Sequence, residues 1–216
     1  MEPYVSEQEQ VEQLRRWWKD NGKALLLGLL LGLGGLTGYR YWDAAQTARA
    51  ESASLNYEQL IKMASSAQLD DALKAGHTIV EAYPGTTYAK LSTLLIAKLA
   101  VEKGDYAQAK TELRSLIDGS GQGEIGNVAR ARLARIMLAE GAADEADKLI
   151  AALPPVANRE RYAELHGDIL AARGDVQGAR TKYLEALAAA DKLGLDRESI
   201  QLKLDNLPAP AKISGS

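Results

Sequence analysis

The most apolar part of the chain is a single run near its N-terminus. No charged residue occurs from Ala24 to Tyr39, and this run contains eight Leu and five Gly. As a helix rising about 1.5 Å per residue it spans about 24 Å, and about 28 Å when it is extended to Trp42. This length is close to the roughly 30 Å hydrocarbon thickness of a bilayer. We therefore predict a transmembrane helix over residues 23–42.

Aromatic residues flank this run on both sides. Trp17 and Trp18 precede it and Trp42 follows it, as is typical of helices that end at membrane interfaces. Two alternatives are a buried core helix and a cleaved signal peptide. An A-x-A pattern at Ala48–Ala50 suits cleavage, but the region before the run is long and rich in acidic residues, unlike a signal peptide. We favour an uncleaved anchor.

Basic residues near the span predict its orientation. Four precede it, Arg15, Arg16, Lys19 and Lys23, whereas the twenty residues after it contain Arg40 and Arg49. This imbalance places the N-terminus in the cytoplasm and the rest of the chain outside. In a Gram-negative cell the protein would be a single-pass inner-membrane protein with a periplasmic C-terminal domain.

The segment before the span, residues 1–22, has an amphipathic pattern. Ser6 and Glu9 fit a capping box, and the apolar residues of the predicted helix cluster on one side: Val11, Leu14, Trp17 and Trp18. We expect this segment to lie at the cytoplasmic membrane surface, where it could also bind a partner.

Glycines in the span follow helical spacing. Gly28 and Gly32 form one GxxxG pattern, Gly34 and Gly38 form another, and Gly35 extends the first face. Small residues at this spacing let two membrane helices approach closely. They predict a contact with a partner's membrane helix or a homodimer, although glycine is also generally enriched in membrane helices.

The remainder of the chain repeats itself around three glycines, Gly104, Gly141 and Gly174, which lie 37 and 33 residues apart. At fixed offsets from each glycine come a small residue, an alanine and a large apolar residue: Ala97, Ala109 and Leu113; Ala134, Ala146 and Ile150; Gly167, Ala179 and Tyr183. This period is typical of tetratricopeptide-type helix pairs.

The geometry of paired helices explains this repeated pattern. Glycine can end a helix in the left-handed conformation, and Asp105 and Asp175 follow two of the glycines as good N-caps. The small residues then let the paired helices pack closely. We predict an all-α protein in which a single N-terminal transmembrane helix precedes a tetratricopeptide-like solenoid over residues 43–207.

A weaker unit precedes these three. Its glycine-equivalent position is Ala67, and Ala72 lies at the expected offset, but Leu60 occupies the small position. The sequence Tyr83-Pro84-Gly85 predicts the end of this unit.

Both ends of the repeat domain can also be predicted. We expect the helix over 44–64 to continue from the membrane helix without a linker. A last helix near 196–206 would cap the stack, and residues 208–216 have the composition of a disordered tail.

In tetratricopeptide proteins the first helix of each pair lines a concave groove. By that analogy the candidate groove residues of this chain are Leu94, Lys98, Val101, Arg135, Leu138, Glu164 and Asp168. Each of these could equally be a core or a solvated position.

Composition gives little support for catalysis or for metal or cofactor binding. The chain has no Cys and a net charge of −3, and its two histidines, His77 and His166, stand outside any HExxH pattern. A GxGxxG match at Gly121–Gly126 lacks the preceding strand that a dinucleotide site requires. We predict no catalytic residue, no cofactor, no metal and no nucleic-acid partner.

The sequence also resembles a known family. The segment QVEQLRRWWKDNGKALLLGLLLGLGGLTGYRYWD (residues 10–43), followed by ARAESASLNYEQL, GDYAQAKTEL and GDVQGARTKYLEAL, resembles the YfgM family, the ancillary subunits of the SecYEG translocon in Gram-negative bacteria. The resemblance extends over essentially the whole chain.

This resemblance implies partners beyond what the residues indicate. It implies association with the SecYEG translocon and transfer of exported proteins to periplasmic chaperones, notably PpiD, through binding by the repeat domain. It also implies a link to the Rcs response regulator at the cytoplasmic end. The alternative hypothesis is a structural tetratricopeptide scaffold in a cell-envelope assembly unrelated to secretion.

Overall fold

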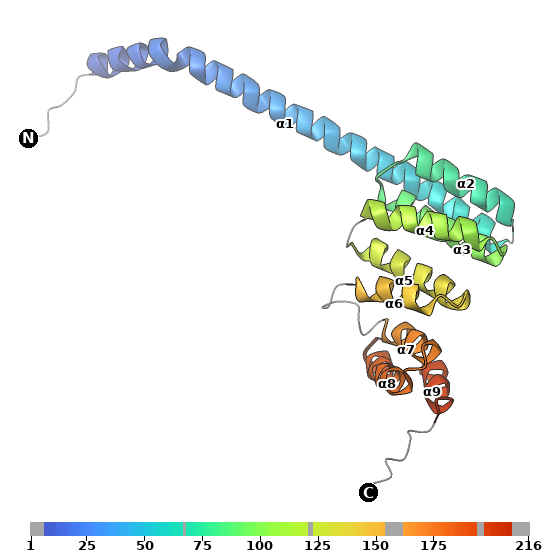
Figure 1. The fold of residues 1–216 in the computed structure, drawn as a ribbon. Coiled ribbons are helices and arrows are strands. Elements are labelled where there is room, and N and C mark those ends of the chain that lie inside the picture. The colour runs from blue at the N-terminus through green and yellow to red at the C-terminus, as the bar shows by residue number, and fades with distance from the viewer. Residues whose placement is uncertain (1–6, 67, 121–122, 154–161, 194–196, 209–216) are drawn as a thin grey trace, which may run out of the picture. The chain divides into compact units, whose positions relative to one another are not determined.

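The computed structural model describes residues 7–66, 68–120, 123–153, 162–193 and 197–208. Throughout these residues the chain forms helices and turns, without a strand, as the sequence predicts (Figure 1). The helices are α1 (Glu7–Ser65), α2 (Leu69–Ala82), α3 (Thr87–Glu102), α4 (Tyr106–Ser120), α5 (Glu124–Ala139), α6 (Ala143–Ala151), α7 (Ala163–Ala172), α8 (Val176–Leu193) and α9 (Glu198–Asp205). Ser6, Ala67, Gly121 and the predicted tail beyond Pro208 lie outside the described residues.

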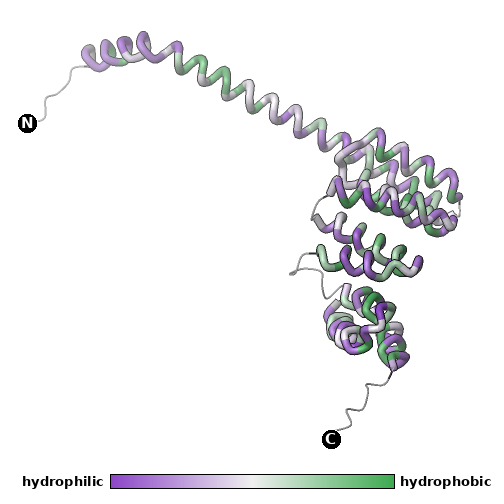
Figure 2. Tube along the Cα trace, in the orientation of Figure 1, coloured by the Kyte–Doolittle hydropathy of each residue, from purple (hydrophilic) through white to green (hydrophobic). Residues whose placement is uncertain are grey.

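The chain divides into two units, Met1–Ser52 and Ala53–Ser216. The first unit contains the apolar run, which Figure 2 shows as a hydrophobic stretch of α1. By length and composition α1 is the one described helix that could cross a membrane, and 6% of its most apolar stretch is buried. A core helix of a water-soluble domain would be mostly buried, so this exposure argues against the core-helix alternative.

The helix of the first unit has no break before the apolar run. The Trp18 ring covers Gly22, where an added Cβ would lie 3.2 Å from the ring, and the Asn21 side-chain amide donates to the Trp17 carbonyl at 3.1 Å. The predicted amphipathic segment and the predicted span therefore belong to one helix, α1.

The second unit is a stack of helix pairs in which each helix from α2 onward packs against the next along the chain. Gly104, Gly141 and Gly174 have φ angles of 79°, 83° and 81°, so the three turns use the left-handed conformation that glycine favours. At the first turn the Gly104 amide donates to the Val101 carbonyl, and the Asp105 amide donates to the Ala100 carbonyl. These bonds form the glycine-ended helix stop that the sequence predicts.

The caps differ among the turns. An Asp105 carboxylate oxygen accepts from the Gln108 amide, and an Asp175 oxygen accepts from the Gly178 amide, each at 2.9 Å. Ala142, the N-cap of α6, makes no such side-chain bond. Two of the three turns thus carry the predicted aspartate cap.

The small, alanine and large apolar positions of the three predicted repeats form the core of their helix pairs. All nine predicted packing residues are buried, from Ala97 on α3 to Tyr183 on α8. In the first pair, formed by the end of α1 and by α2, the large and small side chains are at opposite positions. The buried Leu60 occupies the position that is small in the other pairs, and Gly76 occupies the position that is large in them. A Cβ on Gly76 would lie 2.7 Å from the Ile96 side chain and 3.7 Å from that of Leu60. This exchange explains why the first repeat is weak in sequence.

Candidate functional site

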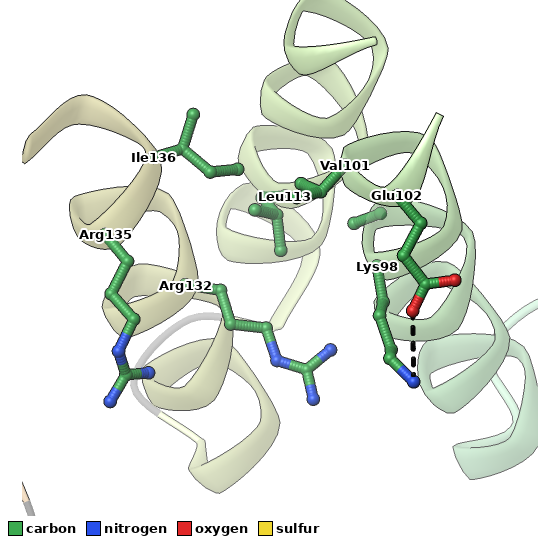
Figure 3. A pocket seen from close by; sticks show the side chains of 8 residues that line it. Lys98, Val101, Glu102, Leu113, Arg132, Arg135 and Ile136 are labelled. Atoms are coloured by element: carbon green, nitrogen blue, oxygen red, sulfur yellow. Dashed lines mark ion pairs between the residues drawn. The ribbon is translucent and has the colours of Figure 1, made fainter. Parts of the chain in front are cut away.

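A hollow of about 460 Å³ in the repeat unit lies between α3 and α5, with α4 at its base (Figure 3). Its apolar surface comes from Ala97, Val101, Leu113 and Ile136, and its polar side chains are Lys98, Glu102, Arg132 and Arg135. Leu113 and Ile136 are themselves core residues. The hollow is thus an opening onto the hydrophobic core with three cations at its edge.

Arg132 extends from α5 toward α3, where Lys98 and Glu102 lie (Figure 3). It is half-buried, and its Nη1 donates to the Leu94 carbonyl at 2.8 Å. Burial lowers the pKa of Arg132, and the neighbouring positive charge of Arg135 lowers it further. Because an arginine side chain is not deprotonated in proteins, the hollow holds a partly desolvated cation near a second one.

The other charges of the hollow are more exposed. Lys98 Nζ lies 3.4 Å from a Glu102 carboxylate oxygen one helical turn away. Arg135 is exposed. Among the described residues no carboxylate pairs with Arg132 or Arg135, so the positive charge at the α5 side is not neutralised by the fold.

A second hollow, of about 270 Å³, adjoins the first on the other side of α3. It shares Lys98 and Glu102 with the first hollow, and its remaining lining is Tyr57, Ile61, Ala64, Ser65, Leu95 and Leu99. The two hollows therefore follow one another across α3, from the last turns of α1 to α5.

The structure brings together three of the seven predicted groove residues. Lys98, Val101 and Arg135 line the main hollow. Leu94 is instead 7% exposed and belongs to the core, because it lies on the side of α3 that packs against α4 and α5. Leu138 packs against the second core cluster around Ala134 and Ile150.

Glu164 and Asp168, the last two predicted groove residues, lie on α7 in an ion network. Lys203 of α9 donates to Glu164 at 2.6 Å and to Asp168 at 2.8 Å. The Tyr183 hydroxyl donates to the other Asp168 oxygen at 2.8 Å. These carboxylates hold the capping helix against α7, and they stand apart from the residues that line the main hollow.

The same network shifts two pKa values. Burial lowers the pKa of Lys203, but its hydrogen bonds to Asp168 and Glu164 outweigh burial, so the pKa is raised. Burial and the hydrogen bond to Asp168 raise the pKa of Tyr183. Both groups therefore keep their protons more firmly in the folded chain than in an unfolded one.

The glycines of the predicted membrane contact all lie in the first unit. A Cβ added at Gly28, Gly32, Gly34, Gly35 or Gly38 would meet nothing within 4 Å. The leucines between them are exposed, as are Trp17, Trp18 and Trp42. Whether a second helix packs on the glycine face stays a prediction.

The two histidines are surface neighbours of acidic groups. His77 Nε2 lies 3.3 Å from the Gln108 amide and 3.9 Å from Glu112, and His166 Nε2 lies 3.5 Å from Asp147. Within the part of the chain that the structure describes, no three His, Asp or Glu side chains form a metal-binding group.

Sequence reasoning missed Arg132, the most buried cation of the hollow. Its position three residues before Arg135 on a predicted first helix was a usable signal, because residues three apart share a helix face. The analogy to groove positions selected only Arg135.

Helix pairs of this size, with glycine turns and a hollow between successive first helices, define the class of tetratricopeptide-like repeat proteins. A family model described as a tetratricopeptide repeat-like domain matches residues 15–209. The solved TPR-like repeats of a Podosopora anserina protein of kinesin light chain type match with a TM-score of 0.54 and 17% identity, over 72% of this chain and 84% of that one. At this identity the likeness concerns the fold alone.

Relatives over the full length define the family more narrowly. An Escherichia coli (strain K12) protein named ancillary SecYEG translocon subunit is 33% identical over 207 residues, which cover 96% of this chain and 99% of that protein. A Haemophilus influenzae protein of the same name is 31% identical over 94% of this chain and 98% of that protein. The chain belongs to the family of ancillary SecYEG translocon subunits, as the sequence predicts. This membership and the exposed apolar stretch of α1 fit a membrane-anchored protein.

Proposed function

We propose that the chain is a non-catalytic adaptor that α1 anchors beside the Sec translocon, and that its repeat unit passes exported proteins to periplasmic chaperones. The observation that carries the proposal is the combination of an exposed apolar helix with an open, cation-edged hollow in one chain. Full-length relatives named ancillary SecYEG translocon subunits support the location.

Tethering explains how such an adaptor could work. A binding surface held beside the translocon meets emerging chains at an effective concentration in the millimolar range for a short tether. Weak contacts with many exported chains would then suffice, and weak contacts would also allow release to a chaperone such as PpiD.

The first test is copurification of the full chain with SecYEG from membranes in mild detergent. Replacing Gly28 and Gly32 by Leu fills one small face while the span stays apolar, and replacing Gly34 and Gly38 by Leu fills the other. We expect the native chain to retain SecYEG and one of the two variants to lose it. Equal retention by the native chain and both variants would refute a contact through the glycines.

The second test concerns orientation, and the absence of cysteine makes it free of background labelling. Single cysteines replace Arg114, which is exposed on α4, and Glu12, which is exposed on α1. A membrane-impermeant maleimide should label Arg114→Cys in spheroplasts and label Glu12→Cys only after the inner membrane is permeabilised. The opposite pattern would place the repeat unit in the cytoplasm, where it could not receive exported chains.

A further inference from the structure

The geometry of the two adjoining hollows points to the chemistry of their ligand. We propose that they bind an extended peptide segment with two apolar side chains about three residues apart and an acidic residue beside one of them. This inference rests on the proposed adaptor function and names the class of chain that the repeat unit binds.

The apolar part of the proposal follows from the lining. The main hollow opens onto Leu113 and Ile136, which are otherwise core residues, and the second hollow is lined mainly by aliphatic and aromatic side chains, including the exposed Ile61. An apolar side chain placed in either hollow would itself leave water and would cover the half-buried Val101 or the 43% exposed Ile61. Such burial stabilises the complex by about 25 cal/mol per Å².

The spacing follows from helix packing. One hollow lies on each side of α3, so their centres are separated by about one helix-to-helix distance, roughly 8–10 Å. An extended chain in the polyproline II conformation rises about 3.1 Å per residue and has three residues per turn, so side chains three residues apart lie on the same face. Two side chains that enter both hollows are therefore about three residues apart, on a segment that crosses the helix axes.

The acidic part of the proposal follows from charge complementarity. Arg132 uses one N–H on the Leu94 carbonyl at 2.8 Å, which leaves further donors of its guanidinium for a ligand. Arg135 lies beside it and has no carboxylate partner among the described residues. Glu102 is occupied by Lys98 at 3.4 Å on the opposite side of the hollow. A ligand carboxylate at the α5 side would relieve the repulsion between the two arginines.

The test uses the full chain in detergent micelles and fluorescence anisotropy with three labelled ten-residue peptides in a Ser-Gly background. The first carries two leucines three residues apart followed by Asp-Glu. The second has Lys-Lys in place of Asp-Glu, and the third has serines in place of the leucines. We expect the first peptide to bind at least roughly tenfold more tightly than either of the others, because a charge-assisted hydrogen bond and a buried leucine are each worth that much.

Two variants assign the effect to the hollow. Arg135→Glu reverses one exposed charge without removing a bond seen in the fold, and Arg114→Glu makes the same change on α4, away from both hollows. We expect Arg135→Glu to weaken the acidic peptide at least roughly tenfold and to favour the lysine peptide, while Arg114→Glu leaves both affinities unchanged. Circular dichroism checks that both variants are folded.

Several outcomes would overturn the proposal. Equal binding of the acidic and lysine peptides would show that the arginines do not select an acidic ligand. Equal effects of Arg135→Glu and Arg114→Glu would show that the peptide does not bind in the hollow. Self-association that Arg135→Glu abolishes would mean that a second copy fills the site. Copurification with SecYEG is measured separately. The Arg135→Glu variant should still copurify with SecYEG although it binds the acidic peptide more weakly, so the two proposals can fail independently.

Discussion

The Tyr183 ring of α8 lies directly over Gly167 of α7, at a place where any side chain on residue 167 would occupy the same space. A Cβ built on Gly167 would lie 2.5 Å from the ring. The ring cannot easily move away, because Tyr183 is 3% exposed and its hydroxyl donates to Asp168 at 2.8 Å. The close packing of α7 against α8 at this point thus depends on a glycine and a tyrosine together.

Gly167→Ala should therefore destabilise the repeat unit, although alanine is the better helix former. We expect a loss of about 1–3 kcal/mol, the usual cost of overpacking, in urea unfolding followed by circular dichroism. Gly119→Ala on α4 is the matched control, because a Cβ there would meet nothing within 4 Å, and it should be neutral or slightly stabilising. Equal effects of the two substitutions would contradict the packing that we describe.

The exchanged positions of large and small residues in the first pair lead us to expect that stability depends on Leu60. Leu60 is fully buried against Ala72 and Ile96, so Leu60→Ala should create a cavity and lower the unfolding free energy by about 2–5 kcal/mol. Leu55 lies five residues earlier on the same helix and is 65% exposed. Leu55→Ala should change stability little, and a comparable loss in both variants would show that Leu60 does not fill the core.

The uncapped turn offers a stabilising change. Ala142 stands where Asp105 and Asp175 cap the other turns, and it makes no side-chain bond to α6. Ala142→Asn should supply the missing acceptor without adding charge next to Asp144 and should raise the unfolding free energy by about 1 kcal/mol. Asp105→Ala should lower it by a similar amount. Loss of stability in Ala142→Asn would show that the turn cannot use a cap.

Alkaline pH should weaken the attachment of α9. In an unfolded chain Tyr183 loses its proton near pH 10.0 and Lys203 near 10.5, whereas both pKa values are raised in the fold. Above about pH 10 the unfolded state therefore binds fewer protons than the folded state, and stability falls as pH rises. Below that pH these two groups contribute no pH dependence.

Melting temperatures between pH 8 and pH 11 test this expectation. Tyr183→Phe should flatten the decline above pH 10, because it removes one of the two titrating groups. Tyr106→Phe is the control, since Tyr106 is exposed, and it should keep the native slope. A native slope in Tyr183→Phe would mean that the tyrosine does not contribute to the alkaline loss.

Much of the fold could be predicted because its signals are local. Gly104, Gly141 and Gly174 mark the turns through a backbone conformation that glycine favours, and this requirement is visible in one residue. The aspartate caps are equally local. The first pair was harder to recognise, because Leu60 and Gly76 satisfy the packing rule jointly, with each size at the opposite position.

The candidate site was less predictable, because it depends on how neighbouring helices register. Leu94 and Lys98 are one turn apart on α3, yet the first is in the core and the second at the hollow. The position of Asp168 in its repeat predicts a groove residue, but α9 places Lys203 2.8 Å from its carboxylate. No local pattern specifies such contacts between helices from different repeats.

Photocrosslinking in living cells tests whether α1 contacts the translocon. A benzoylphenylalanine replaces Leu31, which lies between the two glycine faces and leaves every glycine in place, in one chain and Leu33, which projects from the opposite side of the same helix, in another. We predict a covalent adduct with a SecYEG subunit from position 31 and much less from position 33. If both chains reach the inner membrane and neither position yields a SecYEG adduct, α1 does not contact the translocon through this part of the helix.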